Sequence, residues 1–359
     1  MTPSDLISLR IASLRLHETT WTSSALETVR WMGALQAQDY ESGLWAIGVR
    51  MRDATRLDVI EAITRREILR TWSMRGTWHF VPAEDAAWMH RLMASRMMNT
   101  VRKYSADYGF DDKGLARARE VIVKALACGR ALPRPALVRL LSDGGIDTSD
   151  QGGNHLLRHF GNEGMLCNGI TEGKEPTFVL LNEWVPKPRN IDDDEALALI
   201  TLRYFSSHGP ATVPDFMWWT GLNKAHALRG ILGNGKKLTR VTCDSIDYYH
   251  SPEVEPLNPG ELTLLPAFDE HLLGYRNRGH VLDPGHAKSI CPGGNGVFKP
   301  TIVVKGRVVG VWKRTENPLK AQVELLPFEK LAARLKKPLD QATSRYAQYL
   351  GKPVVLTAP

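Results

Sequence analysis

The chain has 359 residues, 43% of them hydrophobic, and a formal net charge of +7, so it can fill the cores of about two to four domains and favours an anionic partner. It contains no apolar run of the roughly 18 residues that a membrane span needs, and scattered charges in its N-terminus exclude a signal peptide. The four cysteines form no C-x-x-C motif, which argues against a zinc ribbon, an iron–sulfur cluster or a disulfide framework, so we expect a reduced, cytoplasmic protein.

The N-terminal part of the chain predicts helices followed by a β-hairpin, which is the element order of a winged helix-turn-helix module. Between its two expected strands, Gly76 is free to adopt a turn conformation. The expected elements are a helix capped by Ser4, a helix capped by Thr22 or Ser23, a helix over Asp58–Arg65, and strands over Ile68–Ser73 and Thr77–Val81.

The same order of elements then occurs twice more, which predicts a repeated supersecondary unit. The second set comprises helices over Gly114–Cys128, Arg134–Ser142 and Asn154–Gly164, and strands over Met165–Asn168 and Thr177–Leu181 around a wing tip that contains Gly173 and Lys174. The third set comprises a helix over Asp194–Ser206, a helix capped by Thr212, a helix over Lys224–Leu232, and strands over Leu238–Thr242 and Ile246–His250.

The sequence pattern changes after Pro256, where most of the expected elements are strands. Strands are expected over Glu261–Pro266, Val297–Val304, Arg307–Arg314, Ala321–Leu326 and Val354–Thr357, with helical segments over Glu329–Leu350 that break near Pro338. This pattern indicates a small β domain, such as a barrel, with a helix against it. We therefore expect an α+β protein with winged-helix modules at residues 1–105, 106–188 and 189–255 and a barrel-like domain at residues 256–359.

Tandem winged helices with a basic charge balance point to nucleic acid as the partner. Any one of these charges is more often an ordinary solvated residue, but together they can neutralise phosphates. The candidate DNA-binding residues are Arg75, His79, Arg158, His159, Lys236, Lys237, Arg240, Arg276, Arg278, Lys305 and Arg307.

A dense polar cluster, Gln36-Ala37-Gln38-Asp39, follows the apolar run of the second expected helix, and Gly43 is expected to break the pattern. One interpretation is structural, with the amides and Asp39 capping a helix end and tying down a loop. The other is functional, with the amides and the carboxylate lining a pocket and holding a water molecule. The spacing alone favours the structural interpretation.

Motifs distributed along the chain resemble the AlkZ/YcaQ-type DNA glycosylases, also known as winged-helix proteins of the helix-turn-helix 42 class. The motifs are LQAQD at 35–39, MRGTWHFVPAED at 74–85, LLPAFDEHLLGYRNR at 264–278 and VVGVWKR at 308–314. The resemblance implies tandem winged helices in a C-shaped scaffold with a C-terminal β-barrel. It also implies excision of N-alkylated purines, with interstrand crosslinks as a further substrate class.

The family's catalytic signature is Gln-x-Gln or Gln-x-Asp with an aliphatic middle residue, and Gln36-Ala37-Gln38 matches the first form. Ala37 is smaller than the usual middle residue. The resemblance implies that Gln36 and Gln38 orient the attacking water, because a carboxamide both donates and accepts hydrogen bonds. Asp39 would take the proton or face the cationic sugar, or it caps a helix or pairs with Arg50 or Arg75.

The expected function is that of a monofunctional DNA glycosylase that associates with the nucleoid and acts as a monomer on double-stranded DNA with alkylated bases. A winged-helix transcriptional regulator and a non-enzymatic DNA-damage binder are the alternatives. No cofactor or metal is expected, because Asp269 and Glu270 have no partner ligands at metal spacing.

Overall fold

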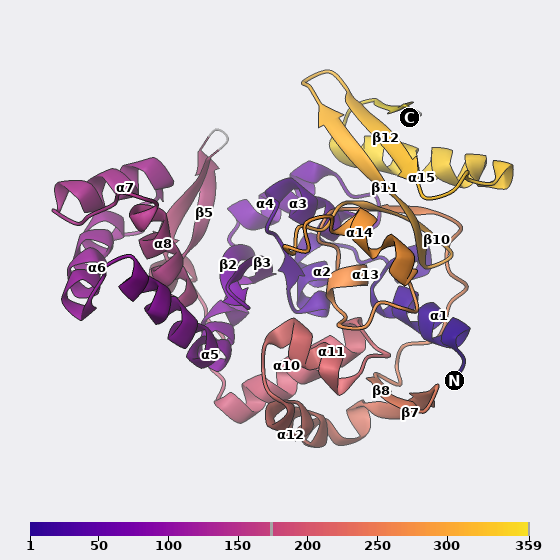
Figure 1. The fold of residues 1–359 in the computed structure, drawn as a ribbon, viewed down its shortest axis with the longest axis horizontal. Coiled ribbons are helices and arrows are strands. Elements are labelled where there is room, and N and C mark those ends of the chain that lie inside the picture. Colours follow the sequence, from indigo (N-terminus) through magenta and orange to yellow (C-terminus); the bar gives the residue numbers. More distant parts are fainter. Residues whose placement is uncertain (173–174, 358–359) are drawn as a thin grey trace. The chain divides into compact units, whose positions relative to one another are not determined.

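The computed structural model describes residues 1–172 and 175–357, which group into two compact units (Figure 1). Unit 1 combines Met1–Ala62 with Ala198–Pro359, and unit 2 spans Ile63–Leu197. Helices and hairpins occur in both units, so the chain belongs to the α+β class. No helix within the described ranges is long and apolar enough to cross a membrane.

Unit 1 begins with short helices. Its N-terminal elements are α1 (Pro3–Ser13), α2 (Ala25–Met32), the short strand β1 (Leu35–Gln36), α3 (Tyr40–Gly48) and α4 (Arg56–Thr64). The caps differ slightly from those expected, since Thr2 and Asp5 form a capping box before α1 and Ser24 caps α2. The first shift follows from Pro3, because proline favours the first helical position and so moves the cap before it.

Unit 2 contains two hairpins and the helices around them. Its elements are β2 (Ile68–Met74), β3 (Thr77–Pro82), α5 (Ala86–Asp107), α6 (Asp112–Leu126), β4 (Leu132–Pro133), α7 (Arg134–Asp143), α8 (Gly152–Asn162), β5 (Leu166–Glu172), β6 (Glu175–Leu180) and α9 (Leu181–Trp184). Strand β6 pairs with β5 on one side and β4 on the other. The predicted helices and hairpins of this region are confirmed within a few residues, whereas the wing tip at Gly173 and Lys174 lies outside the described residues.

The next part of unit 1 follows the third predicted set of elements. It contains α11 (Val213–Thr220), α12 (Lys224–Asn234), β7 (Thr239–Cys243), β8 (Ile246–His250) and, from Ala198 onward, α10 (Asp193–Ser207). The cap expected at Thr212 is confirmed, because Thr212 and Asp215 form a capping box that starts α11. Strands β7 and β8 pair in a hairpin whose turn residues, Asp244 and Ser245, both have positive φ.

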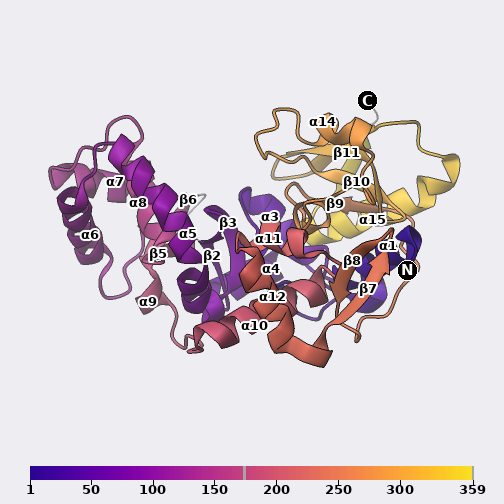
Figure 2. The ribbon, with the colours of Figure 1, turned by 60° about the horizontal axis from the view of Figure 1, so that its bottom comes forward.

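The C-terminal part of unit 1 forms a five-stranded sheet with the order β13-β12-β11-β10-β9. Its elements are β9 (Thr263–Leu265), α13 (Glu270–Leu273), α14 (Ala287–Ile290), β10 (Thr301–Val304), β11 (Arg307–Glu316), β12 (Ala321–Pro327), α15 (Lys336–Leu350) and β13 (Val354–Thr357). Helix α15 lies against the sheet, where Tyr346 packs on Trp312 (Figure 2). The expected break near Pro338 is confirmed, because a 3₁₀ turn over Ala333–Leu335 ends just before α15 and Pro338 stands in the first turn of that helix.

The expected closed barrel is wrong for the described residues. Strand β13 pairs with β12 in parallel, and no pairing joins it to β9 at the other edge of the sheet. A parallel partner needs a crossover connection, and α15 supplies it between β12 and β13. The crossover leaves β13 as an edge strand, so the sheet stays open.

Candidate active site

The Gln-x-Gln stretch forms the extended link between α2 and α3. Helix α2 ends at Gly33, whose φ of 77° suits glycine, and β1 covers Leu35–Gln36. Asp39 then caps α3, because its side chain accepts a hydrogen bond from the Ser42 N–H at 2.8 Å. The cap interpretation of Asp39 is therefore confirmed, whereas the expected break at Gly43 is wrong, since this residue lies inside α3.

The two glutamines of this link lie at different depths. The Gln36 residue is only 7% exposed, and Ala37 is fully buried. Gln38 and Asp39 are both exposed. The link thus presents one amide and one carboxylate at the surface, next to a second amide that is almost covered.

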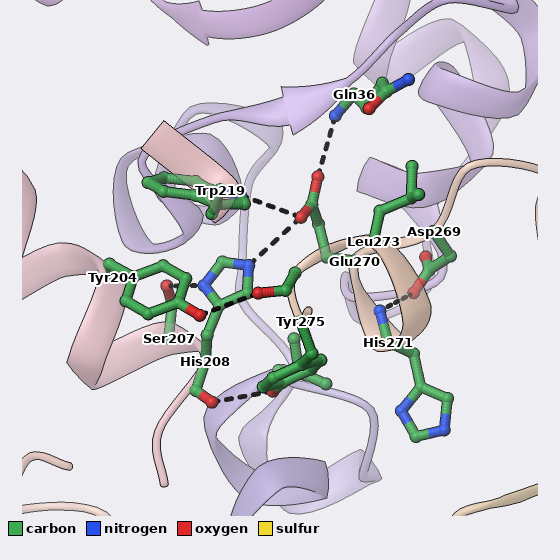
Figure 3. A network of polar contacts seen from close by, with 12 residues as sticks. Gln36, Tyr204, Ser207, His208, Trp219, Asp269, Glu270, His271, Leu273 and Tyr275 are labelled. Carbon is green, nitrogen blue, oxygen red and sulfur yellow. Dashed lines mark hydrogen bonds and ion pairs between the residues drawn. The ribbon is translucent and has the colours of Figure 1, made fainter. Parts of the chain in front are cut away.

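Glu270, the first residue of α13, holds the backbone of this link (Figure 3). The Gln36 N–H donates a hydrogen bond to Glu270 Oε1 at 3.1 Å. The Trp219 indole N–H donates to Glu270 Oε2 at 3.0 Å, and His208 Nε2 lies 3.3 Å from the same oxygen. The carboxyl group of Glu270 is buried, so these donors replace the water that a carboxylate would otherwise bind.

His208 is buried between polar partners and an aromatic ring. Its Nδ1 lies 2.8 Å from Ser207 Oγ, and the Tyr204 ring stacks on the imidazole at 4.8 Å. Burial lowers the pKa of His208, and its hydrogen bond to Glu270 opposes that shift. Tyr275 donates its hydroxyl to the His208 carbonyl at 2.7 Å, which ties the His208 backbone to the segment after α13.

A buried ion pair fixes α13 to the end of α3. Arg50 Nη1 and Nη2 donate to the two oxygens of Asp269 at 2.8 and 2.9 Å, and both side chains are almost fully buried. Asp269 also caps α13 by accepting from the His271 N–H at 2.9 Å. Arg50 therefore pairs with Asp269, and the suggested Asp39–Arg50 pair is not among the described ion pairs. Arg50 lies just beyond the C-cap residue of α3, so carboxylates hold both ends of this helix.

Most of the predicted DNA-binding residues reach the surface of their own unit. The exposed ones are Arg158, Lys236, Lys237, Arg240, Arg276, Lys305 and Arg307, and Arg75 is partly exposed. Two of them have acidic neighbours, since Arg240 lies 3.4 Å from Asp247 and Lys305 lies 3.2 Å from Glu261. Arg278 is partly buried, and its Nε donates to the Leu272 carbonyl at 2.7 Å.

The structure does not support surface roles for His79 and His159. His79 is 0% exposed on β3, and His159 is 3% exposed on α8, where its Nδ1 lies 2.7 Å from Ser105 Oγ. Helix α8 packs against α5 as well as against the core, so the side on which His159 lies is covered. Burial also lowers the pKa of His159, which disfavours the cation that would bind a phosphate.

No local sequence pattern identifies the residues that anchor the link. In the sequence, Glu270 suggests at most a metal ligand, and no local motif marks His208 or Trp219. Glu270 lies 234 positions from Gln36 in the sequence, so no local spacing connects them. The one available signal was the motif at 264–278, which the family resemblance places together with the Gln-x-Gln stretch.

The arrangement suits control of a water molecule. Carboxamides do not titrate and both donate and accept hydrogen bonds, so they can fix the orientation of water at any ordinary pH. The first lysine of the sequence is Lys103, so the chain around the Gln-x-Gln stretch offers no lysine for a Schiff base. The chemistry that fits these groups is hydrolysis.

Comparisons with known proteins point to one family of enzymes. The profile of the family described as "DNA glycosylase AlkZ-like" matches residues 29–349. A curated protein of Streptomyces sahachiroi, named "Interstrand DNA cross-link repair glycosylase", is 28% identical over 315 residues, which cover 82% of this chain and 84% of that protein. The solved structure of Streptomyces sahachiroi DNA glycosylase AlkZ has the same fold, with a TM-score of 0.80 at 23% identity, over 99% of this chain and 100% of that one.

The matched range includes the Gln-x-Gln stretch, α13 and most of α15, so the family assignment covers the candidate active site together with its anchors. This chain belongs to the AlkZ-like family of DNA glycosylases, hydrolases of the N-glycosidic bond that act in DNA repair.

Proposed function

We propose that this glycosylase removes cationic, N-alkylated purines from duplex DNA, with Gln36 and Gln38 orienting the attacking water. The observation that carries the proposal is the fixed link between α2 and α3. Its backbone is bound to Glu270 at one end and its Asp39 caps α3 at the other, while the Gln38 amide stays exposed. A rigid pair of amides is what positioning of a water molecule requires.

The choice of substrate follows from the groups at the link. A purine alkylated at N7 or N3 carries a positive charge and leaves as a neutral base, so its departure needs no general acid. The sugar then resembles an oxocarbenium ion, and water attacks C1′ after the nucleotide has been extruded from the stack. Asp39 keeps one oxygen on the α3 cap. We propose that its carboxylate also takes the proton or stabilises the cationic sugar.

Interstrand crosslinks attached through an alkylated purine nitrogen belong to the same chemical class. The curated relative from Streptomyces sahachiroi is named for the repair of such crosslinks. Because the crosslinked purine is also cationic, we propose that this chain accepts it by the same mechanism.

We further infer that the repeated helix–hairpin sets are winged-helix modules that bind DNA, the enzyme acting as a monomer. The recurrence of helices followed by β2–β3, β5–β6 and β7–β8 supports this division. The exposed basic residues Arg158, Lys236, Lys237, Arg276 and Arg307 would contact phosphates.

DNA affinity is therefore expected to fall steeply with salt. Each phosphate neutralised by lysine or arginine contributes a slope of about −0.9 to log K against log[salt]. Titration of a fluorescent duplex at several salt concentrations measures the slope. The Lys236→Ala, Lys237→Ala double variant should reduce it by about one to two, and an affinity that does not change with salt would contradict the proposed surface.

The experiment that tests the proposed function is incubation with a duplex that contains one 7-methylguanine. We expect release of the free base, strand cleavage only after alkali, and no protein–DNA adduct on treatment with borohydride, because no lysine precedes Lys103 in the sequence. Absence of base release would contradict the substrate class. A borohydride-trapped adduct would contradict simple hydrolysis.

A further inference from the structure

We propose that Glu270 is a positioning residue of this glycosylase, which sets the geometry of the Gln-x-Gln stretch from α13. The inference rests on the proposed role of Gln36 and Gln38. It starts from the fact that Glu270 binds the backbone of the stretch, at the Gln36 N–H, while Figure 3 shows the Gln36 amide pointing away from the carboxylate. Glu270 therefore acts on the backbone of the stretch, and through it on the position of the Gln36 side chain.

The donors around Glu270 require two acceptor oxygens. Gln36 N–H and the Trp219 indole N–H are donors that cannot change role, and they bind different oxygens, at 3.1 and 3.0 Å. A carboxylate accepts on both oxygens. A carboxamide at position 270 accepts on one only, so its NH₂ group would face one of these buried N–H groups and push it away.

His208 is the adaptable member of this network. Ser207 donates its hydroxyl to the Arg203 carbonyl at 2.7 Å, so Ser207 Oγ is free to accept from His208 Nδ1. In that tautomer, neutral His208 presents Nε2 as an acceptor at the Glu270 side; when the Ser207 hydroxyl turns to donate to Nδ1 instead, Nε2–H donates to the Glu270 carboxylate. His208 can therefore face either a donor or an acceptor at position 270, which Trp219 cannot.

Packing leaves little room for the network to rearrange. Trp219 lies against the turn that precedes the link, since a Cβ added at Gly33 would meet Trp219 Cη2 at 3.5 Å. A Cβ added at Gly274 would overlap His208 Cδ2. A wrong hydrogen bond at Glu270 is therefore expected to displace the Gln36 backbone, because it cannot be absorbed by the surrounding side chains.

The test is a cycle of Glu270→Gln and Trp219→Phe, read by single-turnover excision of 7-methylguanine and by DNA affinity. Glu270→Gln should slow excision about tenfold to a hundredfold with unchanged affinity, the usual cost of a displaced catalytic contact. Trp219→Phe removes the fixed donor at Oε2, so in the double variant the new amide can accept from Gln36 N–H and donate to His208. The double variant should therefore be about tenfold faster than Glu270→Gln alone.

Asp85 offers a matched control, because it is a fully buried carboxylate that accepts the Trp88 indole N–H at 2.8 Å in unit 2. Asp85→Asn should lower thermal stability as Glu270→Gln does but leave the excision rate of the folded protein unchanged. A merely structural role of Glu270 predicts equal effects of the two variants on excision and no gain in the double variant.

Hydrogen exchange distinguishes a local displacement of the Gln36 backbone from a general loss of stability. In Glu270→Gln, hydrogen exchange at the backbone N–H of Gln36 should accelerate. Exchange at the backbone N–H of Ser42, which donates to Asp39, should stay slow. If Glu270→Gln does not fold, Glu270→Asp replaces it, and excision at the wild-type rate would overturn the proposal. If Gln36→Ala is slow while Glu270→Gln matches the wild type, the positioning role alone fails. If neither variant is slow, the proposed function of the glutamines fails.

Discussion

Replacement of Gln38 by alanine is expected to slow excision of 7-methylguanine by about 10²–10³, and Gln36→Ala should have a similar effect. Removal of one preorganised polar contact to a transition state usually costs a factor of this size. The structure makes Gln38 the more accessible of the two amides and Gln36 the more firmly held. Single-turnover kinetics with excess enzyme measure the chemical step directly.

The affinity for abasic DNA should change little in both variants, because phosphate contacts dominate binding. Gln341→Ala is the matched control, since Gln341 is an exposed glutamine on α15, outside the candidate active site. Full activity of both Gln36→Ala and Gln38→Ala would mean that the stretch has a structural role only. A loss in Gln341→Ala as large as in Gln38→Ala would point to an indirect effect on folding.

Asp269→Ala should be the most destabilising substitution near the site, at about 3–5 kcal/mol. It removes the partner of Arg50, whose buried guanidinium keeps only the carbonyls of Leu14 and Ala46 as described acceptors. A buried charge left without its counter-ion carries a cost of this order. Urea denaturation, read by tryptophan fluorescence, gives the free energy of unfolding.

An exposed ion pair provides the comparison for this prediction. Lys313 and Glu324 lie 3.6 Å apart on β11 and β12, with both side chains well exposed. Glu324→Ala should leave the unfolding midpoint nearly unchanged, because solvent screens such pairs. If Asp269→Ala were no more destabilising than Glu324→Ala, the Arg50–Asp269 pair would not be what fixes α13 to α3.

The sequence predicted the hairpins best, because β-branched and aromatic runs flank residues that favour turns. Strands β2 and β3 agree with prediction within a residue or so, and Gly76 has a φ of 67° in the turn between them. Helix α5 (Ala86–Asp107) was not predicted, although Trp88, Met89 and Met93 are buried along it. It lies between the sets of elements that the repeat pattern emphasised.

Closure of the C-terminal sheet could not be predicted from strand number. Whether a sheet closes depends on pairing between its first and last strands, and this is a contact between segments that no local pattern reports. The same limit applies to His79. Strand β2 is buried along its whole length and β3 nearly so, so both faces of the hairpin are covered and alternation does not identify an exposed side.

The candidate site was predictable only in its local part. Gln36, Gln38 and Asp39 are neighbours in the sequence, and their side-chain chemistry drew attention to them. The groups that hold them, Glu270 and Trp219, come from distant segments and meet only in the fold. Sequence reasoning identified the amides, whereas the structure identified what keeps them in place.

Single-turnover release of 7-methylguanine and of uracil from otherwise identical duplexes tests the proposed mechanism most directly. Gln36 and Gln38 are neutral and cannot protonate a leaving base, so we expect rapid release of the cationic purine and background release of uracil. Comparable rates for both bases would mean that a general acid acts on the base, and would contradict the central claim that oriented water and a charged leaving group suffice.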